Sequence, residues 1–254
     1  MDTLFLVPFF AGLPIALLLA WLGPLLRLRE EWLATLGLAH LAGASGLAGL
    51  AAGLPVVLGA PLGALAGAAL KNRARGGNSV YALMILAGWA LTLLVAANSP
   101  LGDALAHALV DGQLYFSGFR ELAVAWILCA MGILALPWLT PRLIRGHLFP
   151  QHEVANRLPA WRWHLGFDML TALAIAVGTA TLGLMATFAL VFVPAWVAFR
   201  HARDWRRGNL ASVGLGLACY GTAFGVALLL DQPFGPVLVA VLVLVFLAGL
   251  GWRR

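Results

Sequence analysis

Charged residues are scarce in this sequence. Only 10% of the 254 residues are charged, whereas 62% are hydrophobic, and an ordinary soluble domain carries about 25% charged residues. So little charge cannot cover a surface that faces water, which excludes a typical soluble domain. In lipid, by contrast, a helix satisfies its own backbone hydrogen bonds. The composition therefore predicts an all-α polytopic transmembrane helical bundle that forms a single domain over residues 1–254.

Several chemical motifs are also missing. The only lysine, Lys71, lacks the glycine spacing of a Walker A motif, so we do not expect the chain to bind ATP by that route. There is no H-E-x-x-H sequence, and Asp168 is the only carboxylate well inside an apolar run, so paired intramembrane aspartates are missing too. Cys129 and Cys219 provide no disulfide framework. We expect no enzymatic activity and no cofactor.

Apolar runs long enough to cross a membrane recur along the chain. A spanning helix needs about 20 apolar residues, and nine segments are candidates. Two adjacent pairs are weakly separated, at residues 53–55 and around residues 178–181, so eight spans remain an alternative. The candidate segments are 4–25, 33–53, 54–70, 79–97, 121–143, 165–182, 183–199, 209–230 and 233–251.

The positive charge is distributed unevenly between the loops. With nine spans, every basic residue except Arg120 falls on one side of the membrane. The positive-inside rule makes that side cytoplasmic, with the N-terminus outside and the C-terminus in the cytoplasm. This bias accounts for the net charge of +6 without nucleic acid as a partner. The residues on the basic side are Arg27, Arg29, Lys71, Arg73, Arg75, Arg142, Arg145, Arg157, Arg162, Arg200, Arg203, Arg206, Arg207, Arg253 and Arg254.

The longest polar stretch on the basic side is the loop 144–164. Pro150 can begin a short helix there, with Gln151 and Glu153 in its first turn, where the positive end of the helix dipole favours acidic groups. Pro159 would end it. The pattern fits both a docking surface and a solvated connector.

Small residues predict close helix packing. Gly59, Gly63 and Gly67 recur every four residues on one helix face, which is the spacing of tightly packed transmembrane helices. A second run, Gly43-Ala44-Ser45-Gly46, matches the G-x-S-G of rhomboid proteases. The nearest histidine, His40, is about 140° away around the same helix and cannot act as the base for Ser45. Packing is therefore the favoured interpretation of this run.

His40 itself lies inside the second apolar segment. An ionisable residue within a span is costly and marks a functional path by default, and imidazole is a standard ligand for zinc and similar ions. The alternative is a structural histidine that hydrogen-bonds a neighbouring carbonyl. A conduction path binds its ion weakly enough to release it, so one imidazole is compatible with a pore-lining contact.

Four stretches, at residues 23–43, 149–158, 183–195 and 230–239, resemble in order segments of the membrane permeases of ABC importers for zinc and manganese. In this comparison His40 falls on the family's histidine, and Leu36 stands where the family has an aspartate. The other matching positions, which the resemblance marks as structural, are Pro194, Asp231, Pro233, Gly235 and Pro236.

The resemblance implies a division of labour between subunits. A separate ATP-binding subunit would push on the cytoplasmic loop 144–164, and an extracytoplasmic substrate-binding protein would deliver the substrate near 98–121 and Gln232-Pro233. A second permease copy, by default identical, would complete a central path within the lipid of a bacterial inner membrane. The residues expected to contact the ATPase are Pro150, Gln151, Glu153, Ala155 and Arg157.

The expected function is translocation of a divalent transition metal, zinc or manganese. Three alternatives stay open. Leu36 favours the same fold carrying another substrate, such as a metal chelate. An intramembrane serine protease would use Ser45, and a membrane scaffold would lack an ATPase partner.

Overall fold

The computed structural model describes residues 3–74, 77–99 and 112–251, and within these ranges the protein is helical, with no strand. This confirms the predicted all-α class. The elements are α1 (Thr3–Leu28), α2 (Trp32–Ala51), α3 (Val56–Arg73), α4 (Asn78–Ala97), the short 3-10 helix η1 (Leu114–Phe116), α6 (Phe119–Leu148), α7 (Pro150–Ala155), α8 (Ala160–Leu182), α9 (Leu184–His201), α10 (Trp205–Leu230) and α11 (Phe234–Gly251).

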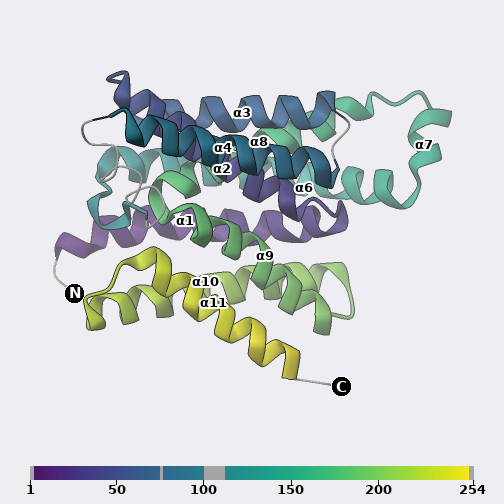
Figure 1. The fold of residues 1–254 in the computed structure, drawn as a ribbon. Coiled ribbons are helices and arrows are strands. Elements are labelled where there is room, and N and C mark those ends of the chain that lie inside the picture. Colours follow the sequence, from purple (N-terminus) through teal and green to yellow (C-terminus); the bar gives the residue numbers. More distant parts are fainter. Residues whose placement is uncertain (1–2, 75–76, 100–111, 252–254) are drawn as a thin grey trace.

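The long helices run back and forth between two ends of the bundle, so that α1 begins at one end and α11 finishes at the other (Figure 1). Of those in the described ranges, eight are long and apolar enough to cross a membrane. The exception is α3, whose last turn carries Lys71 and Arg73. At 18 residues, α3 is nevertheless as long as α9 and α11, which are both candidate spans, so α3 is long enough to be a ninth. The prediction of eight to nine spans is therefore confirmed.

The two weak joints differ. The first is a turn between α2 and α3, where Gly53 has a φ of +81°. The weak joint was expected around 178–181, but α8 continues unbroken through these residues to Leu182, which agrees with the predicted segment bounds 165–182 and 183–199. The chain turns instead at Gly183, whose φ of +94° is a conformation that glycine adopts without steric cost. Thr181 donates its hydroxyl to the Val177 carbonyl at 2.8 Å, an ordinary bond within a helix.

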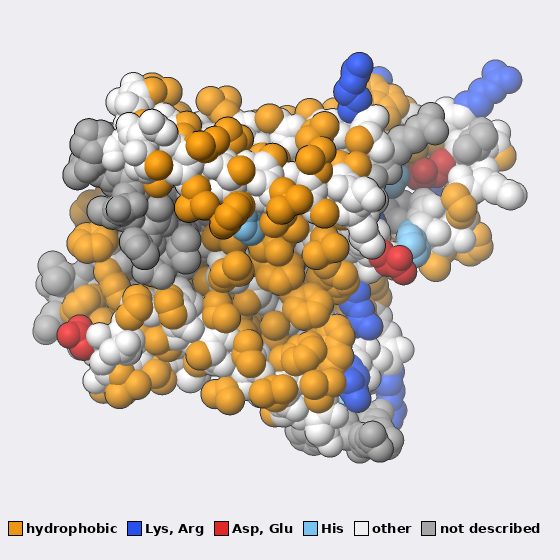
Figure 2. Space-filling model, viewed as in Figure 1, with side chains coloured by type: hydrophobic (Ala, Val, Ile, Leu, Met, Phe, Trp, Pro, Cys, Tyr) orange, Lys and Arg blue, Asp and Glu red, His pale blue; other side chains and the backbone are white. Residues whose placement is uncertain are grey.

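Basic side chains gather at one end of the bundle. Figure 2 shows hydrophobic side chains across the body of the molecule and Lys and Arg side chains towards the end from which α7 projects. The helices α1, α3, α6 and α9 finish at this basic end, and each has a basic residue in its last turn. Arg120 lies in the first turn of α6, at the opposite end. Arg75, Arg253 and Arg254 lie outside the described residues.

The predicted glycine face of α3 packs on α2. A Cβ atom added to Gly59 would lie 2.7 Å from the Ser45 carbonyl oxygen, and one added to Gly67 would lie 2.8 Å from Leu41 Cδ1. The same atom at Gly63 would collide with the Ser45 side chain and the Leu41 carbonyl. Close backbone approach of this kind is how small residues stabilise helix pairs in lipid.

Candidate functional site

His40 lies in α2 where α4 crosses it. A Cβ atom added to Gly88 of α4 would lie 2.7 Å from His40 Cβ, so the two backbones are in direct contact. The His40 Nδ1 atom lies 2.9 Å from the Leu36 carbonyl oxygen. A carbonyl only accepts, so Nδ1 must carry the proton in the neutral ring, and Nε2 keeps its lone pair. Metal-bound histidines are held in the same way, with the second nitrogen donating to a backbone carbonyl.

The surroundings of His40 do not form a closed metal site. Within the described ranges, no three His, Cys, Asp or Glu side chains converge. Leu36 lies one turn before His40 and on the same helix face, so the position nearest the imidazole is apolar. The side chain of His40 is half-buried. A half-buried imidazole with a free lone pair can make one weak contact to a passing ion, and cannot hold an ion alone.

Ser45 takes part in helix packing. Its hydroxyl donates to the Ala42 carbonyl at 3.2 Å and accepts the Gly63 backbone N–H at 3.1 Å. The first contact lies within α2, and the second joins α3 to α2. This geometry supports the packing interpretation over a serine nucleophile, since both hydrogen bonds of the hydroxyl are used within the bundle.

The predicted short helix in the loop 144–164 is present as α7, which begins at Pro150 and projects from the basic end between α6 and α8 (Figure 1). Pro159 does not end α7 as predicted, because that helix already ends at Ala155 and the backbone turns at Arg157, which has a φ of +50°; Pro159 instead precedes the first residue of α8. Four of the five residues expected to contact an ATPase are exposed: Pro150, Gln151, Ala155 and Arg157.

The fifth of these residues, Glu153, turns inward. Its carboxylate accepts the indole N–H of Trp163 at 3.0 Å and lies 3.8 Å from His164 Nε2, both in the first turns of α8. A Cβ atom added to Gly146 of α6 would lie 2.6 Å from Glu153 Oε1. Glu153 therefore fastens α7 to the helices on either side of it and does not face outward.

The family-motif positions lie in α9 and around the turn between α10 and α11. Pro194 is buried in α9, and a Cβ atom added to Gly216 of α10 would lie 3.6 Å from its ring. Asp231 ends α10 with a φ of +51°, and the next residue, Gln232, donates its N–H to the Ala227 carbonyl at 3.0 Å. Pro233 precedes α11, and Gly235 and Pro236 occupy its first turn. These residues shape a helix crossing and a turn.

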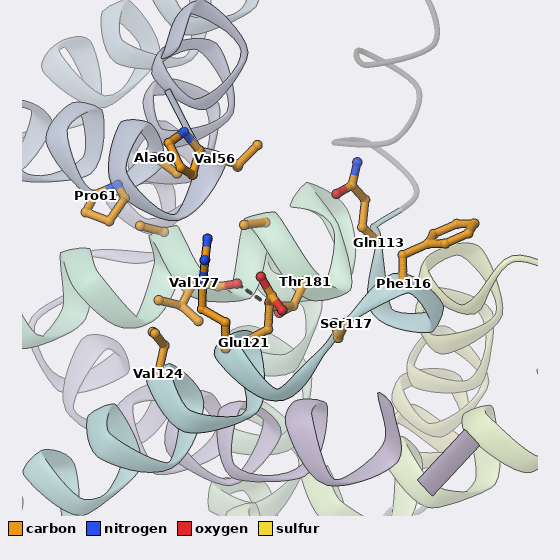
Figure 3. Close-up of a pocket in the computed structure, with 14 residues that line it drawn as sticks. Val56, Ala60, Pro61, Gln113, Phe116, Ser117, Glu121, Val124, Val177 and Thr181 are labelled. Atoms are coloured by element: carbon orange, nitrogen blue, oxygen red, sulfur yellow. Dashed lines mark hydrogen bonds between the residues drawn. The ribbon is translucent and has the colours of Figure 1, made fainter. Parts of the chain in front are cut away.

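A cavity of about 190 Å³ lies at the end opposite α7, and Arg120 is among the residues that line it. Figure 3 shows Val56, Ala60 and Pro61 of α3 on one side of it, and Glu121 and Val124 at the start of α6 on the other. The Glu121 carboxylate accepts the Gly118 N–H at 2.9 Å and so caps α6. The predicted outer segment 98–121 includes Asp103 and Asp111, which lie outside the described residues.

A buried cluster of charges at the basic end was not predicted. Lys71 Nζ lies 2.7 Å from Asp168 Oδ1 and 3.1 Å from Glu31 Oε2. Arg29 lies 3.0 Å from Glu31 Oε1 and 3.1 Å from Asp168 Oδ1. We call these four residues the inner charge network. Lys71 is 5% exposed and Asp168 2% exposed. The sequence offered two signals, a lone lysine and a lone carboxylate within a span, but nothing joined them.

An all-helical bundle of apolar spans with one basic end defines a polytopic membrane protein, and an imidazole within a span is typical of a functional path through such a protein. A model of the ABC 3 transport family matches residues 1–252. The chain therefore belongs to the ABC 3 transport family, as the resemblance in its sequence predicted.

Solved structures agree on the fold. PsaBC from Streptococcus pneumoniae, in complex with Fab, matches with a TM-score of 0.85 and 14% identity over 98% of this chain and 91% of the other. A metal-chelate type ABC transporter in an inward-facing conformation matches with a TM-score of 0.79 and 14% identity over 97% of this chain and 85% of the other. A search of curated proteins finds no significant match.

Proposed function

We propose that this chain is the permease subunit of an ABC importer that carries a divalent transition metal, zinc or manganese, across the bacterial inner membrane. The family match over residues 1–252 carries this proposal. The chain has no Walker A sequence, so the energy of transport comes from a separate ATP-binding subunit. A second copy of the chain, by default identical, completes the central translocation path, as the resemblance to ABC importer permeases implies.

The orientation follows from the charge distribution. The basic end faces the cytoplasm by the positive-inside rule, which places the start of α1 outside and the end of α11 inside. The exposed residues of α7 then form the docking surface for the ATPase. The turn at Gln232-Pro233 lies at the outer end, where an extracytoplasmic binding protein delivers the substrate.

The substrate is tested by competition. Vesicles containing the permease with its ATPase and binding protein should take up labelled zinc or manganese, and the unlabelled ion should compete. A free ion is favoured by the half-buried His40 with its Nε2 lone pair. A metal chelate is the second candidate, because Leu36 makes the adjoining position apolar. If uptake requires an organic chelator and free metal does not compete, the substrate is a metal chelate and not a free ion.

A bulky residue on α7 should block docking of the ATPase. Ala155 is exposed on α7, so Ala155→Trp removes no contact within the chain and adds volume where the partner must fit. We expect ATP-dependent uptake to fall about tenfold or more, because packing at the centre of an interface dominates its affinity. Copurification of the ATPase should fall with it.

The control is Ala211→Trp, which adds the same volume at an exposed position near the start of α10, at the same end of the bundle. This variant should retain uptake and copurification. Equal uptake by both variants would show that α7 is a connector and not the docking surface.

A further inference from the structure

The inner charge network forms a closed ring. Going around it, Arg29 contacts Glu31, Glu31 contacts Lys71, Lys71 contacts Asp168, and Asp168 contacts Arg29 again. Two cations and two carboxylates balance, and each charge has two partners. Opening any one edge of this ring leaves the two charges at that edge with one partner each and the other two charges with both of theirs, so the ring can rearrange without leaving a buried ion unpaired.

One edge is incomplete as the ring stands. Arg29 Nη1 lies 3.1 Å from Asp168 Oδ1 but has no hydrogen-bond geometry to any acceptor in the described residues. Asp168 Oδ2 is buried and likewise lacks a hydrogen-bond partner there. Buried polar atoms are almost always hydrogen-bonded in native structures. The Arg29–Asp168 edge therefore has unused donors and acceptors that can take over if Asp168 loses Lys71.

The ring joins segments that are far apart in the sequence. Arg29 and Glu31 lie between α1 and α2, Lys71 lies in the last turn of α3, and Asp168 lies in α8. Asp168 is one helical turn after His164, which lies beside Glu153 of α7. A displacement of α7 therefore reaches Asp168 through the first two turns of a single rigid helix.

Space for rearrangement is present next to the ring. A cavity of about 560 Å³ at the basic end is lined by Arg29, Glu31, Lys71, Tyr81 and His164, among others. Water in this cavity can solvate a side chain that leaves its partner. A purely structural cluster has no need of such a space, and well-packed apolar residues would serve stability as well as a buried ion pair does.

We propose that Lys71 and Asp168 are positioning residues that transmit movement of α7 to the inner end of the bundle. When the ATPase pulls on α7, α8 moves Asp168 away from Lys71. Lys71 then keeps its ion pair with Glu31, and Asp168 keeps its ion pair with Arg29. Release of the Lys71 edge frees the end of α3 from α8 and opens the inner end of the path. The inference rests on the proposed function, in that α7 is taken to be the site where the ATPase acts.

The test separates folding from coupling. Lys71→Met and Asp168→Asn each leave one unmatched buried charge, so each should lower the amount of folded protein. The double variant Lys71→Met/Asp168→Asn leaves Arg29 paired with Glu31 and is neutral, so folded yield and ATPase binding should return. Metal taken up per ATP hydrolysed, measured in proteoliposomes with the ATPase and binding protein, should nevertheless stay about tenfold below wild type.

A matched control uses the exposed pair formed by Asp204 and Arg207, whose Nε–Oδ2 distance is 3.3 Å, at the same end of the bundle. Asp204→Asn/Arg207→Met should leave the coupling ratio unchanged. A double network variant that folds and couples like wild type would show that the ring is only structural and would overturn the inference. The proposed function fails only if the wild-type assembly does not take up metal with ATP. The two failures are therefore distinguishable, because the first is seen in the double variant and the second in the wild type.

Discussion

Gly63→Leu should prevent the bundle from assembling. A Cβ atom at this position collides with the Ser45 side chain and the Leu41 carbonyl, and the rest of a leucine side chain has no space between α2 and α3. The substitution also pushes the Gly63 N–H away from Ser45 Oγ, which it contacts at 3.1 Å. Overpacking in a dense interior costs about 1 to 3 kcal/mol for modest additions, and here the obstacle is backbone, so we expect at least about 3 kcal/mol.

The measurement is the yield and melting temperature of the purified chain in detergent. Gly221→Leu is the matched control, because it makes the same change within α10 at a glycine whose added Cβ meets nothing within 4 Å. We expect this control to melt close to wild type. A Gly63 variant as stable as the Gly221 variant would mean that α2 and α3 do not pack closely in the membrane.

The spacing of small residues predicted one packing face and missed others. Gly59, Gly63 and Gly67 repeat every four residues, so their common face could be found before any partner was known. Gly88 is as tightly packed, against His40, but it has no such repeat around it. Its contact partner is set by how α4 crosses α2, which depends on the whole bundle and not on local spacing.

The sequence predicted where the basic residues lie but not how the buried charges pair. Counting basic residues along the chain located the basic end correctly for those in the described residues, because loop position alone decides that. The pairing of Lys71 with Asp168 spans 97 residues, and the charge of Lys71 was explained sufficiently as a topology signal. A buried lysine and a buried carboxylate in a lipid-facing chain each need a partner, and the sequence has few candidates. This need for a buried partner could have been used to predict the ion pair between Lys71 and Asp168.

In the loop 144–164, the local sequence predicts the start of a helix but not its contacts with other helices. Pro150 was correctly predicted to begin α7, because proline is favoured in the first turn of a helix. The end of α7 was predicted less well, since the helix stops at Ala155, before Pro159. The inward turn of Glu153 could not be predicted in the same way. Its partners, Trp163 and His164, come from the next helix, and only the fold brings them to its carboxylate.

His40→Ala should abolish most metal uptake while leaving the bundle folded. The Nδ1 bond of His40 goes to a carbonyl of its own helix, and alanine is the best helix former, so losing the ring removes no bond between helices. What is lost is the Nε2 lone pair, which we propose contacts the ion in the translocation path. Loss of a residue that only orients a metal ligand already costs about 10- to 100-fold in metal affinity or activity, so we expect the loss of a direct contact to lower initial uptake rates by at least about tenfold.

Two further variants make this result specific. His147→Ala removes an exposed imidazole at the end of α6 and should leave uptake unchanged at equal abundance. Leu36→Asp places a carboxylate one turn before His40, on the same face, where it can share an ion with Nε2. If the path carries a free divalent ion, this variant should lower the metal concentration needed for half-maximal uptake. If the path carries a chelate instead, the new charge faces an apolar or anionic ligand and should weaken uptake. The direction of the change therefore distinguishes a free ion from a chelate.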